Sequence, residues 1–281
     1  MQVDKNLEKL YEAMYGQEFN RTLLTGSMKK GFSTFSIHNI DDLKEAINKT
    51  NLEDEIYISF YDYNTDEDVT RWMKTDLNKF ISTSIKNSLV IRFRKNSEIL
   101  KEEVRDLTDI QKFMFIRRTI NLGFNEEIVE ECKKTYDYLE DKLNIKGYSV
   151  FNGINECSLY LFFDEEEFEN PTETLYYFYT FLEKTLNLKT ITYAEIEPFS
   201  QIITLLGSQN KDSKLYVKSY DINSEYKEII QNSTDKNTNY ILPDKTQDTT
   251  KLNKLLETID AGITKTKAQG KSLLEIDIDN I

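Results

Sequence analysis

The hydrophobic residues of the chain recur with two different periods. Residues 55–63 alternate apolar side chains with more polar ones, which is typical of a strand with one buried face. Residues 125–144 instead repeat apolar side chains at helical spacing, which predicts an amphipathic helix with Asn125 as its N-cap. The alternating pattern also predicts strands at 88–93, 148–153, 158–163, 190–197 and 214–222. The helical pattern also predicts helices over 3–15, 41–48, 67–86, 98–121, 171–186 and 251–260.

This order of helices and strands predicts an α+β fold. We expect a core of mixed or antiparallel strands flanked by helices over 51–231, after an N-terminal helical region over 1–50. Residues 232–249 are polar and rich in turn-forming side chains, which predicts a linker. Residues 250–281 are expected to form a short helix and a flexible acidic tail. With nine glycines and three prolines, the chain has too few turn-formers for a many-hairpin sandwich or barrel.

Charge and residue counts exclude several kinds of site. The net charge is −13, which repels phosphate unless basic residues cluster locally. The chain has a single histidine, His38, and one histidine cannot form a histidine-rich metal site. Cys132 and Cys157, the only cysteines, are too few for a disulfide framework or a zinc site, and they favour a reducing compartment. The sequence contains neither the apolar core of a signal peptide nor a long apolar run. We therefore expect a cytoplasmic protein with no membrane partner.

Several short motifs suggest binding chemistry, but structural roles explain them better. Residues 62–68 resemble a calcium loop but lack its glycine and its final glutamate. Residues 26–32 contain glycines and lysines but not the lysine–hydroxyl pair of a phosphate loop. The acidic run at 164–169 is typical of a solvated helix start. Asp277 and Asp279 would share one face of a strand, as two metal ligands could, although a docking segment or an edge strand is the simpler interpretation.

Residues 125–163 resemble the archaeo-eukaryotic primase family, which includes the primase-polymerases of archaeal plasmids. In that family a strand ending in Ser-Gly is followed by a short turn and by a histidine that begins an apolar strand. Here Asn152 stands at the serine position, Gly153 matches the glycine, and Ser158 stands at the histidine position.

An earlier segment, 88–96, resembles the strand on which the family carries two acids that bind the catalytic metals. Arg92 and Arg94 stand where those acids belong, so positive charge replaces the metal ligands. The two arginines alternate onto one strand face and could bind phosphate or an acidic partner, or they could simply pair with surface acids. Lys95, Arg117 and Arg118 could extend a basic patch.

A later segment follows the family outline as well, so that the resemblance covers about residues 55–230. Glu195 or Glu197 could fill the position of an acidic metal ligand. Thr204 replaces an arginine of the family and Leu206 replaces a proline. The residues that fit the outline here are Gly207, Ser208, Asn210 and Lys211.

The resemblance leads to three hypotheses about function. The first is a non-catalytic accessory protein of DNA replication, without a cofactor, that binds a replication protein such as a catalytic primase subunit and also single-stranded DNA or a primer–template. The second is a divergent primase or polymerase that uses Mg²⁺ or Mn²⁺ on displaced carboxylates, with candidates Asp62, Asp66, Glu195 and Asp277. The third is an acidic protein-interaction factor unrelated to primases, such as a mobile-element factor. Arg92 and Arg94 should lie beside Ser158 if the altered site exists.

Overall fold

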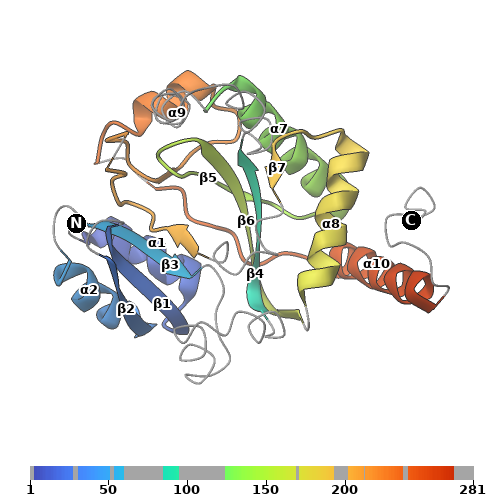
Figure 1. Cartoon of the computed structure of the whole chain (residues 1–281), viewed down its shortest axis with the longest axis horizontal. Coiled ribbons are helices and arrows are strands. Elements are labelled where there is room, and N and C mark those ends of the chain that lie inside the picture. Colours follow the sequence, from blue (N-terminus) through green and yellow to red (C-terminus); the bar gives the residue numbers. More distant parts are fainter. Residues whose placement is uncertain are drawn as a thin grey trace, which may run out of the picture.

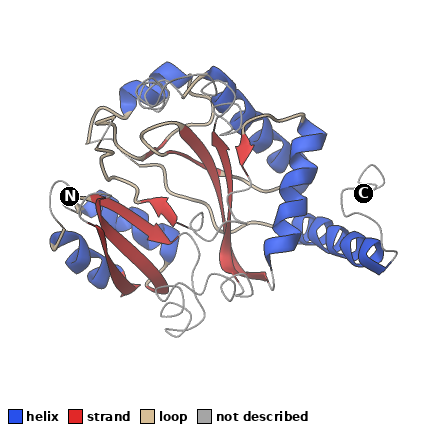
Figure 2. Ribbon diagram, viewed as in Figure 1, coloured by secondary structure: helices blue, strands red, loops and turns tan. Residues whose placement is uncertain are grey.

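The computed structural model describes residues 3–27, 31–50, 54–59, 85–94, 124–168, 171–192, 202–211, 213–236 and 240–268. Within these ranges the chain has an α+β fold, which confirms the predicted fold class (Figure 1, Figure 2). The strands form a four-stranded and a five-stranded sheet, and every strand pair is antiparallel. In this part of the chain, no helix combines the length and the apolar character needed to cross a membrane.

The first sheet contains β1 (Glu18–Ser27), β2 (Gly31–Asn39), β3 (Glu55–Ser59) and β8 (Ile202–Thr204). Its strands lie in the order β2–β1–β3–β8. Helices α1 (Lys5–Tyr15) and α2 (Ile40–Asn48) accompany it. The Asp4 carboxylate caps α1 by accepting the amides of Asn6 and Leu7, and the Tyr11 hydroxyl ties this helix to the Leu206 carbonyl at 2.6 Å.

The second sheet contains β4 (Ile85–Arg94), β5 (Tyr148–Phe151), β6 (Glu156–Phe168), β7 (Ile191–Thr192) and β9 (Lys218–Ser219). Its order is β7–β4–β6–β5–β9, so β4 and β6 lie side by side at its centre. The remaining helical elements are α7 (Glu126–Tyr138) with the π-helical turn η1 (Leu139–Leu143), α8 (Pro171–Leu186), α9 (Tyr226–Asn232) and α10 (Thr250–Ala268). Asn125 caps α7 through the amide of Ile128, as its sequence position predicts.

The two faces of the second sheet have different neighbours. Helix α7 packs against β4 and β6 (Figure 1). On β6, Cys157 belongs to the face under α7, because its thiol contacts that of Cys132 in the helix. Glu156 and Ser158 alternate with Cys157 and therefore belong to the opposite face. Tyr160 continues that face and interacts with the end of α1, so this side of the sheet is turned toward the first sheet.

The expectation of a purely helical region over 1–50 is corrected by the structure. Helices α1 and α2 are present, but the β1–β2 hairpin lies between them. Thr22 and Thr25 are buried in β1, where their β-branched side chains pack like apolar residues. Arg21, Thr22 and Leu23 are buried in succession, so β1 is covered on both faces and its sequence shows no alternation of apolar and polar residues.

Other element boundaries also differ from the sequence expectation. Residues 85 and 86 belong to β4 and not to the end of a helix over 67–86. Within 214–222, only Lys218 and Ser219 form a strand. The helix expected over 98–121 and the C-terminal tail lie outside the described residues.

The segment that the sequence predicts to be a linker is, in its described residues, hydrogen-bonded to the second sheet and to Lys146 shortly before β5. The Tyr148 hydroxyl donates to the Ile241 carbonyl at 2.8 Å. The Gln247 side-chain amide donates to the Phe162 carbonyl at 2.8 Å, and its oxygen accepts the Lys146 amide at 2.5 Å. These bonds hold the segment that leads to α10 along the sheet.

Candidate nucleic-acid interface

The segments that carry Arg92 and Ser158 lie on the adjacent strands β4 and β6. In the register of β4 and β6, Arg92 is opposite Ser158 and Arg94 is opposite Glu156. Arg92, Arg94 and Ser158 occupy the same face of the sheet, because residues two apart on a strand point the same way. The strand register therefore makes Arg92 and Ser158 direct neighbours on one face of the second sheet.

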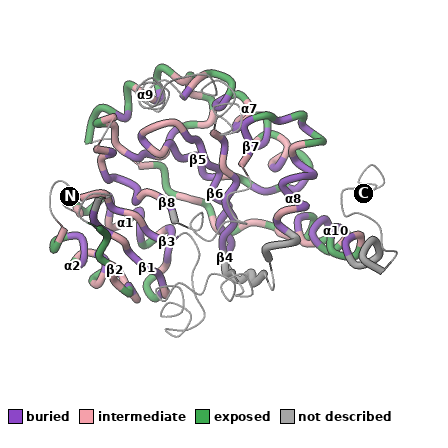
Figure 3. The backbone as a smooth tube through the Cα atoms, in the orientation of Figure 1, coloured by how far each residue is buried: buried purple, intermediate pink, exposed green. Residues whose placement is uncertain are grey.

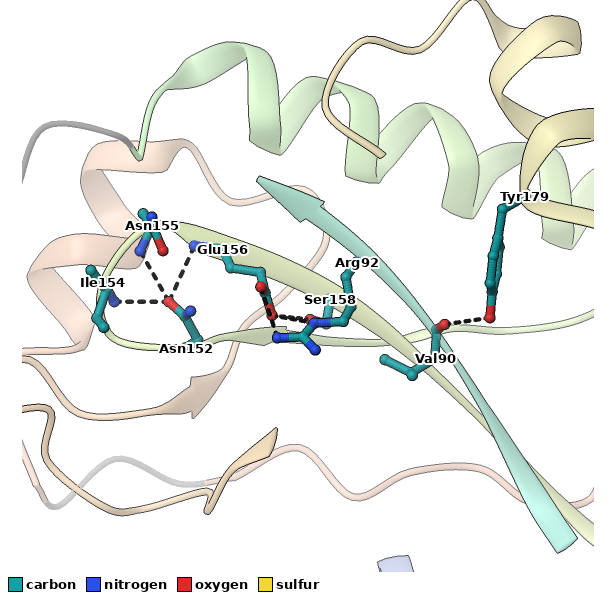
Figure 4. Close-up of polar contacts among 8 residues, drawn as sticks. All are labelled: Val90, Arg92, Asn152, Ile154, Asn155, Glu156, Ser158 and Tyr179. Carbon is teal, nitrogen blue, oxygen red and sulfur yellow. Dashed lines mark hydrogen bonds and ion pairs between the residues drawn. The ribbon is translucent and has the colours of Figure 1, made fainter. Parts of the chain in front are cut away.

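The central feature of this face is an ion pair between Arg92 and Glu156 (Figure 4). Arg92 Nε donates to Glu156 Oε1 at 2.8 Å, and Arg92 Nη2 donates to Oε2 at 3.0 Å. The two side chains are only 13% and 5% exposed. Ser158 Oγ adds a third bond, at 3.2 Å, to Glu156 Oε1. Such a bidentate pair neutralises both charges and orients the guanidinium in one plane.

Glu156 is the functional candidate that sequence reasoning missed. It immediately follows the β5–β6 turn and stands two residues before Ser158. The predicted strand began only at residue 158, but extending it by two residues would have placed both side chains on one face. Its partner could not be inferred in the same way, since Arg92 is 64 residues away in sequence.

Arg94 and the neighbouring strand β7 complete this face. Arg94 is half-buried, and its amide donates to the Thr190 carbonyl at 2.8 Å. Thr192 of β7 is opposite Arg92 on the side of β4 away from Ser158. The Glu131 carboxylate of α7 accepts the amides of Lys189 and Thr190 at 2.8–2.9 Å. Helix α7 thereby positions the strand that borders Arg92.

Asn152 builds the turn between β5 and β6. Its side-chain oxygen accepts the backbone amides of Ile154, Asn155 and Glu156 at 2.9–3.1 Å (Figure 4). Gly153 follows with φ 79°, a left-handed conformation that suits glycine. Asn152 was a candidate phosphate ligand, and its oxygen serves the turn that leads into Glu156.

Asn210 has a similar role in a second turn, which packs against the first. It is buried, and its side-chain oxygen accepts the Ser213 amide at 3.0 Å. A Cβ on Gly153 would lie 3.0 Å from the Leu215 carbonyl oxygen and 3.4 Å from Asn210 Cβ. The Ser213 hydroxyl also donates to the Gly153 carbonyl. The fold thus brings together the two asparagine turns of the family outline, with the half-buried Lys211 beside Asn210.

The remaining candidates of the sequence analysis lie outside the described residues and stay predictions. They are Lys95, Arg117, Arg118, Glu195, Glu197, Asp62, Asp66 and Asp277. Among the described residues, no group of three or more His, Cys, Asp or Glu side chains could hold a metal ion.

Buried tyrosines line the side of the second sheet that faces α1. Burial raises the pKa of Tyr160 well above its usual value, and it raises the pKa of Tyr15 to about 12. The Arg21 guanidinium lies 4.3 Å from the centre of the Tyr15 ring and donates to the Ser59 carbonyl at 2.9 Å. A second arginine is therefore held in the interior on this side of the fold.

We expect the replacement Asn152→Ala to lower the free energy of unfolding by about 1–3 kcal/mol, because three amides lose their acceptor. Urea denaturation followed by circular dichroism would measure this loss. Asn152→Asp keeps an acceptor oxygen and should retain most of the stability. The matched control is Asn155→Ala in the same turn, expected to stay within about 0.5 kcal/mol of the parent chain. Equal effects of the two alanine variants would contradict this role of Asn152.

Comparison with protein-family models and with curated protein sequences finds no match to the chain. Among solved structures, the chain aligns with the polymerase domain of Mycobacterium tuberculosis ligase D in complex with DNA. The alignment covers 98% of this chain and 89% of that chain, with 11% sequence identity and a TM-score of 0.46. This likeness is too distant to assign a function, so the function must be argued from the residues of the chain itself.

Proposed function

We propose that the chain is a primase-like accessory protein of DNA replication that acts by binding and not by nucleotidyl transfer. The proposal rests on the family outline in the sequence together with the arrangement of β4 and β6. The positions that correspond to the metal-binding acids and the histidine of the family are neighbours on one sheet face. The side chains at those positions are arginines and a serine.

The observation that carries this proposal is the buried Arg92–Glu156 pair. Nucleotidyl transfer by the two-metal route needs carboxylate oxygens that are available to divalent cations. Both oxygens of Glu156 already accept hydrogen bonds from Arg92. A cation bound by Glu156 would have to displace the guanidinium and would leave that positive charge uncompensated beside the metal. This part of the sheet is therefore better suited to a binding surface than to a metal centre.

The ligand of this surface follows from the charges. We propose a protein partner first, such as a catalytic primase subunit, because a chain of net charge −13 repels a nucleic-acid backbone as a whole. Single-stranded DNA or a primer–template would be held locally. Arg94 is the described candidate for a phosphate contact, since the guanidinium of Arg92 is engaged by Glu156. Lys95, Arg117 and Arg118 would extend the contact.

The experiment that tests the absence of catalysis is a primer-synthesis assay on the purified chain with Mg²⁺ or Mn²⁺. We expect no product above background. Synthesis that disappears on Glu195→Gln or Glu197→Gln would overturn the proposal in favour of a divergent polymerase that uses displaced carboxylates.

Binding is tested with Arg94→Ala and fluorescence anisotropy of labelled single-stranded DNA at two salt concentrations. We expect weaker binding and a salt dependence reduced by about one ion, as for the loss of one phosphate contact. Lys254→Ala on α10 is the matched control, because it removes one exposed positive charge far from β4 in the sequence. Equal affinities of the two variants would contradict a nucleic-acid contact at Arg94.

A further inference from the structure

The sheet edges in the described part of the chain differ greatly in length. Three of the four edge strands are very short: β8 has three residues, and β7 and β9 have two each. Strand β2 has nine, and it lies at the outer edge of the first sheet (Figure 1). Short edges are a common protection against pairing with another chain. Strand β2 lacks this protection.

The direction of the free backbone groups of β2 follows from its neighbours. The Thr22 amide donates to Ser59 Oγ, so even-numbered residues of β1 bond toward β3. Leu23 of β1 therefore bonds toward β2, where it is paired with Phe35. It follows that the alternate residues of β2, namely Phe32, Thr34 and Ser36, direct their N–H and C=O groups away from the sheet.

The outward-facing series ends at His38, which is covered. Its amide donates to Asp42 Oδ2 of α2 at 2.9 Å. No described strand covers the three preceding outward positions. Phe32 is 40% exposed and Ser36 is exposed as well. Figure 3 shows exposed stretches along β2. The open edge is thus the part of β2 from Phe32 to Ser36.

The side chains of β2 also lack the usual devices that block an edge. The strand contains no proline and no Asp, Glu, Lys or Arg. Its pairing with β1 is regular from Ile37 to Gly31, without a bulge. Charged residues, proline and bulges are the features that keep an exposed edge from pairing. This neutral strand belongs to a chain of net charge −13.

We propose that β2 pairs with β2 of a second copy of this chain, antiparallel and about a twofold axis at Thr34. This register places Thr34 opposite Thr34 of the second copy, and Phe32 opposite its Ser36. All outward backbone groups of the open edge then find partners, and no like charges come together. Because both copies are acidic, the rest of their surfaces repel each other. The neutral strand β2 is therefore the place where two copies can meet with the least electrostatic repulsion. A single strand pair is a small interface, so the dimer should be weak and should strengthen with salt.

Sedimentation velocity of the full chain over a range of concentrations tests the association. We expect a monomer–dimer equilibrium that shifts to dimer as concentration and salt rise. Thr34→Lys should abolish the dimer, because it places two lysines directly opposite each other at the proposed twofold axis. The control Thr234→Lys makes the same change in net charge at an exposed position in the turn after α9, and it should leave the dimer intact. A monomer at every concentration, or equal dimerisation of the two variants, would overturn the proposal.

Cross-linking tests the register. Because Cys132 and Cys157 are buried, Thr34→Cys supplies a partly exposed thiol at the proposed twofold axis. Mild oxidation should link this variant into covalent dimers at low protein concentration, whereas Thr234→Cys should remain largely unlinked. Circular dichroism and thermal unfolding would establish that both variants are folded. Cross-linking no faster for Thr34→Cys than for Thr234→Cys would rule out pairing centred on this residue.

Discussion

The replacement Glu156→Ala is expected to lower the free energy of unfolding by about 3–5 kcal/mol, because it removes the carboxylate that pairs with the Arg92 guanidinium, whose side chain is only 13% exposed. Arg92→Ala should cost a similar amount, since it leaves the Glu156 carboxylate with only the Ser158 hydroxyl as a described side-chain donor. Urea denaturation at neutral pH would measure both losses.

The double variant Arg92→Met with Glu156→Leu tests whether the loss comes from the orphaned charge. Replacing a buried pair by apolar residues of similar size is often neutral, so the double variant should be far more stable than either single alanine variant. Glu45→Ala is the matched control, because Glu45 pairs with Lys49 at the surface with side chains 66% and 59% exposed. That surface pair is worth less than about 1 kcal/mol. A Glu156→Ala cost no larger than this control would contradict the structural role of the pair.

The same double variant separates stability from function. If it folds and still binds single-stranded DNA or its partner as the parent chain does, the ion pair serves the fold alone. If it folds and binding falls, the orientation of polar groups by Arg92 and Glu156 contributes to the interface. Either outcome can be separated from misfolding, because the apolar pair removes both charges together.

Alkaline pH is expected to destabilise the chain steeply, because several tyrosines are neutral in the folded state at pH values where they ionise in the unfolded chain. Burial raises the pKa of Tyr11, Tyr148, Tyr160 and Tyr220 above the usual 10.0, and it raises that of Tyr15 to about 12. Above the unfolded pKa, the folded state binds more protons than the unfolded state, so stability falls as pH rises. Each such tyrosine contributes about 1.4 kcal/mol per pH unit in the window between its two pKa values.

Urea midpoints measured between about pH 9 and about pH 11 would test this dependence, with tyrosinate absorbance recorded on the same samples. Ionisation of the buried tyrosines should coincide with unfolding. Tyr15→Phe is a suitable variant, because the buried Tyr15 hydroxyl has no hydrogen-bond partner among the described residues. At pH 7 the variant should have nearly the same free energy of unfolding as the parent chain. At alkaline pH its free energy of unfolding should fall less steeply with pH, by the contribution of one tyrosine. A flat stability profile across this range would contradict the burial of these hydroxyls.

The elements whose hydrophobic pattern was clear could be predicted from the sequence alone. The cap at Asn125 and the start of α8 at Pro171 follow local rules that depend on neighbouring residues only. The β1–β2 hairpin could not be predicted in this way. Thr22 and Thr25 lie on opposite faces of β1 and both are buried, and their burial depends on the strands and helices packed around them.

The candidate interface was predictable in part. Sequence reasoning identified Arg92 and Ser158 and made their proximity the condition for an altered site, and the strand register places the two residues opposite each other. Asn152 and Asn210 were identified for their positions in the family outline, and the structure shows that both hold turns. Glu156 was missed because its one local signal, the spacing of two residues from Ser158, indicates neither its burial nor its pairing with Arg92.

The sequence by itself determined the α+β class, most of the local elements and the alternation of Arg92 and Arg94 on one strand. Only the tertiary structure decided what surrounds those arginines. The partner of Arg92 depends on the register between β4 and β6, and a shift of one residue would move Glu156 to the opposite face. Local propensities do not specify this register, because it results from the packing of the Cys157 face under α7. The pairing of β1 with both β2 and β3 likewise left the neutral strand β2 at an edge of the first sheet.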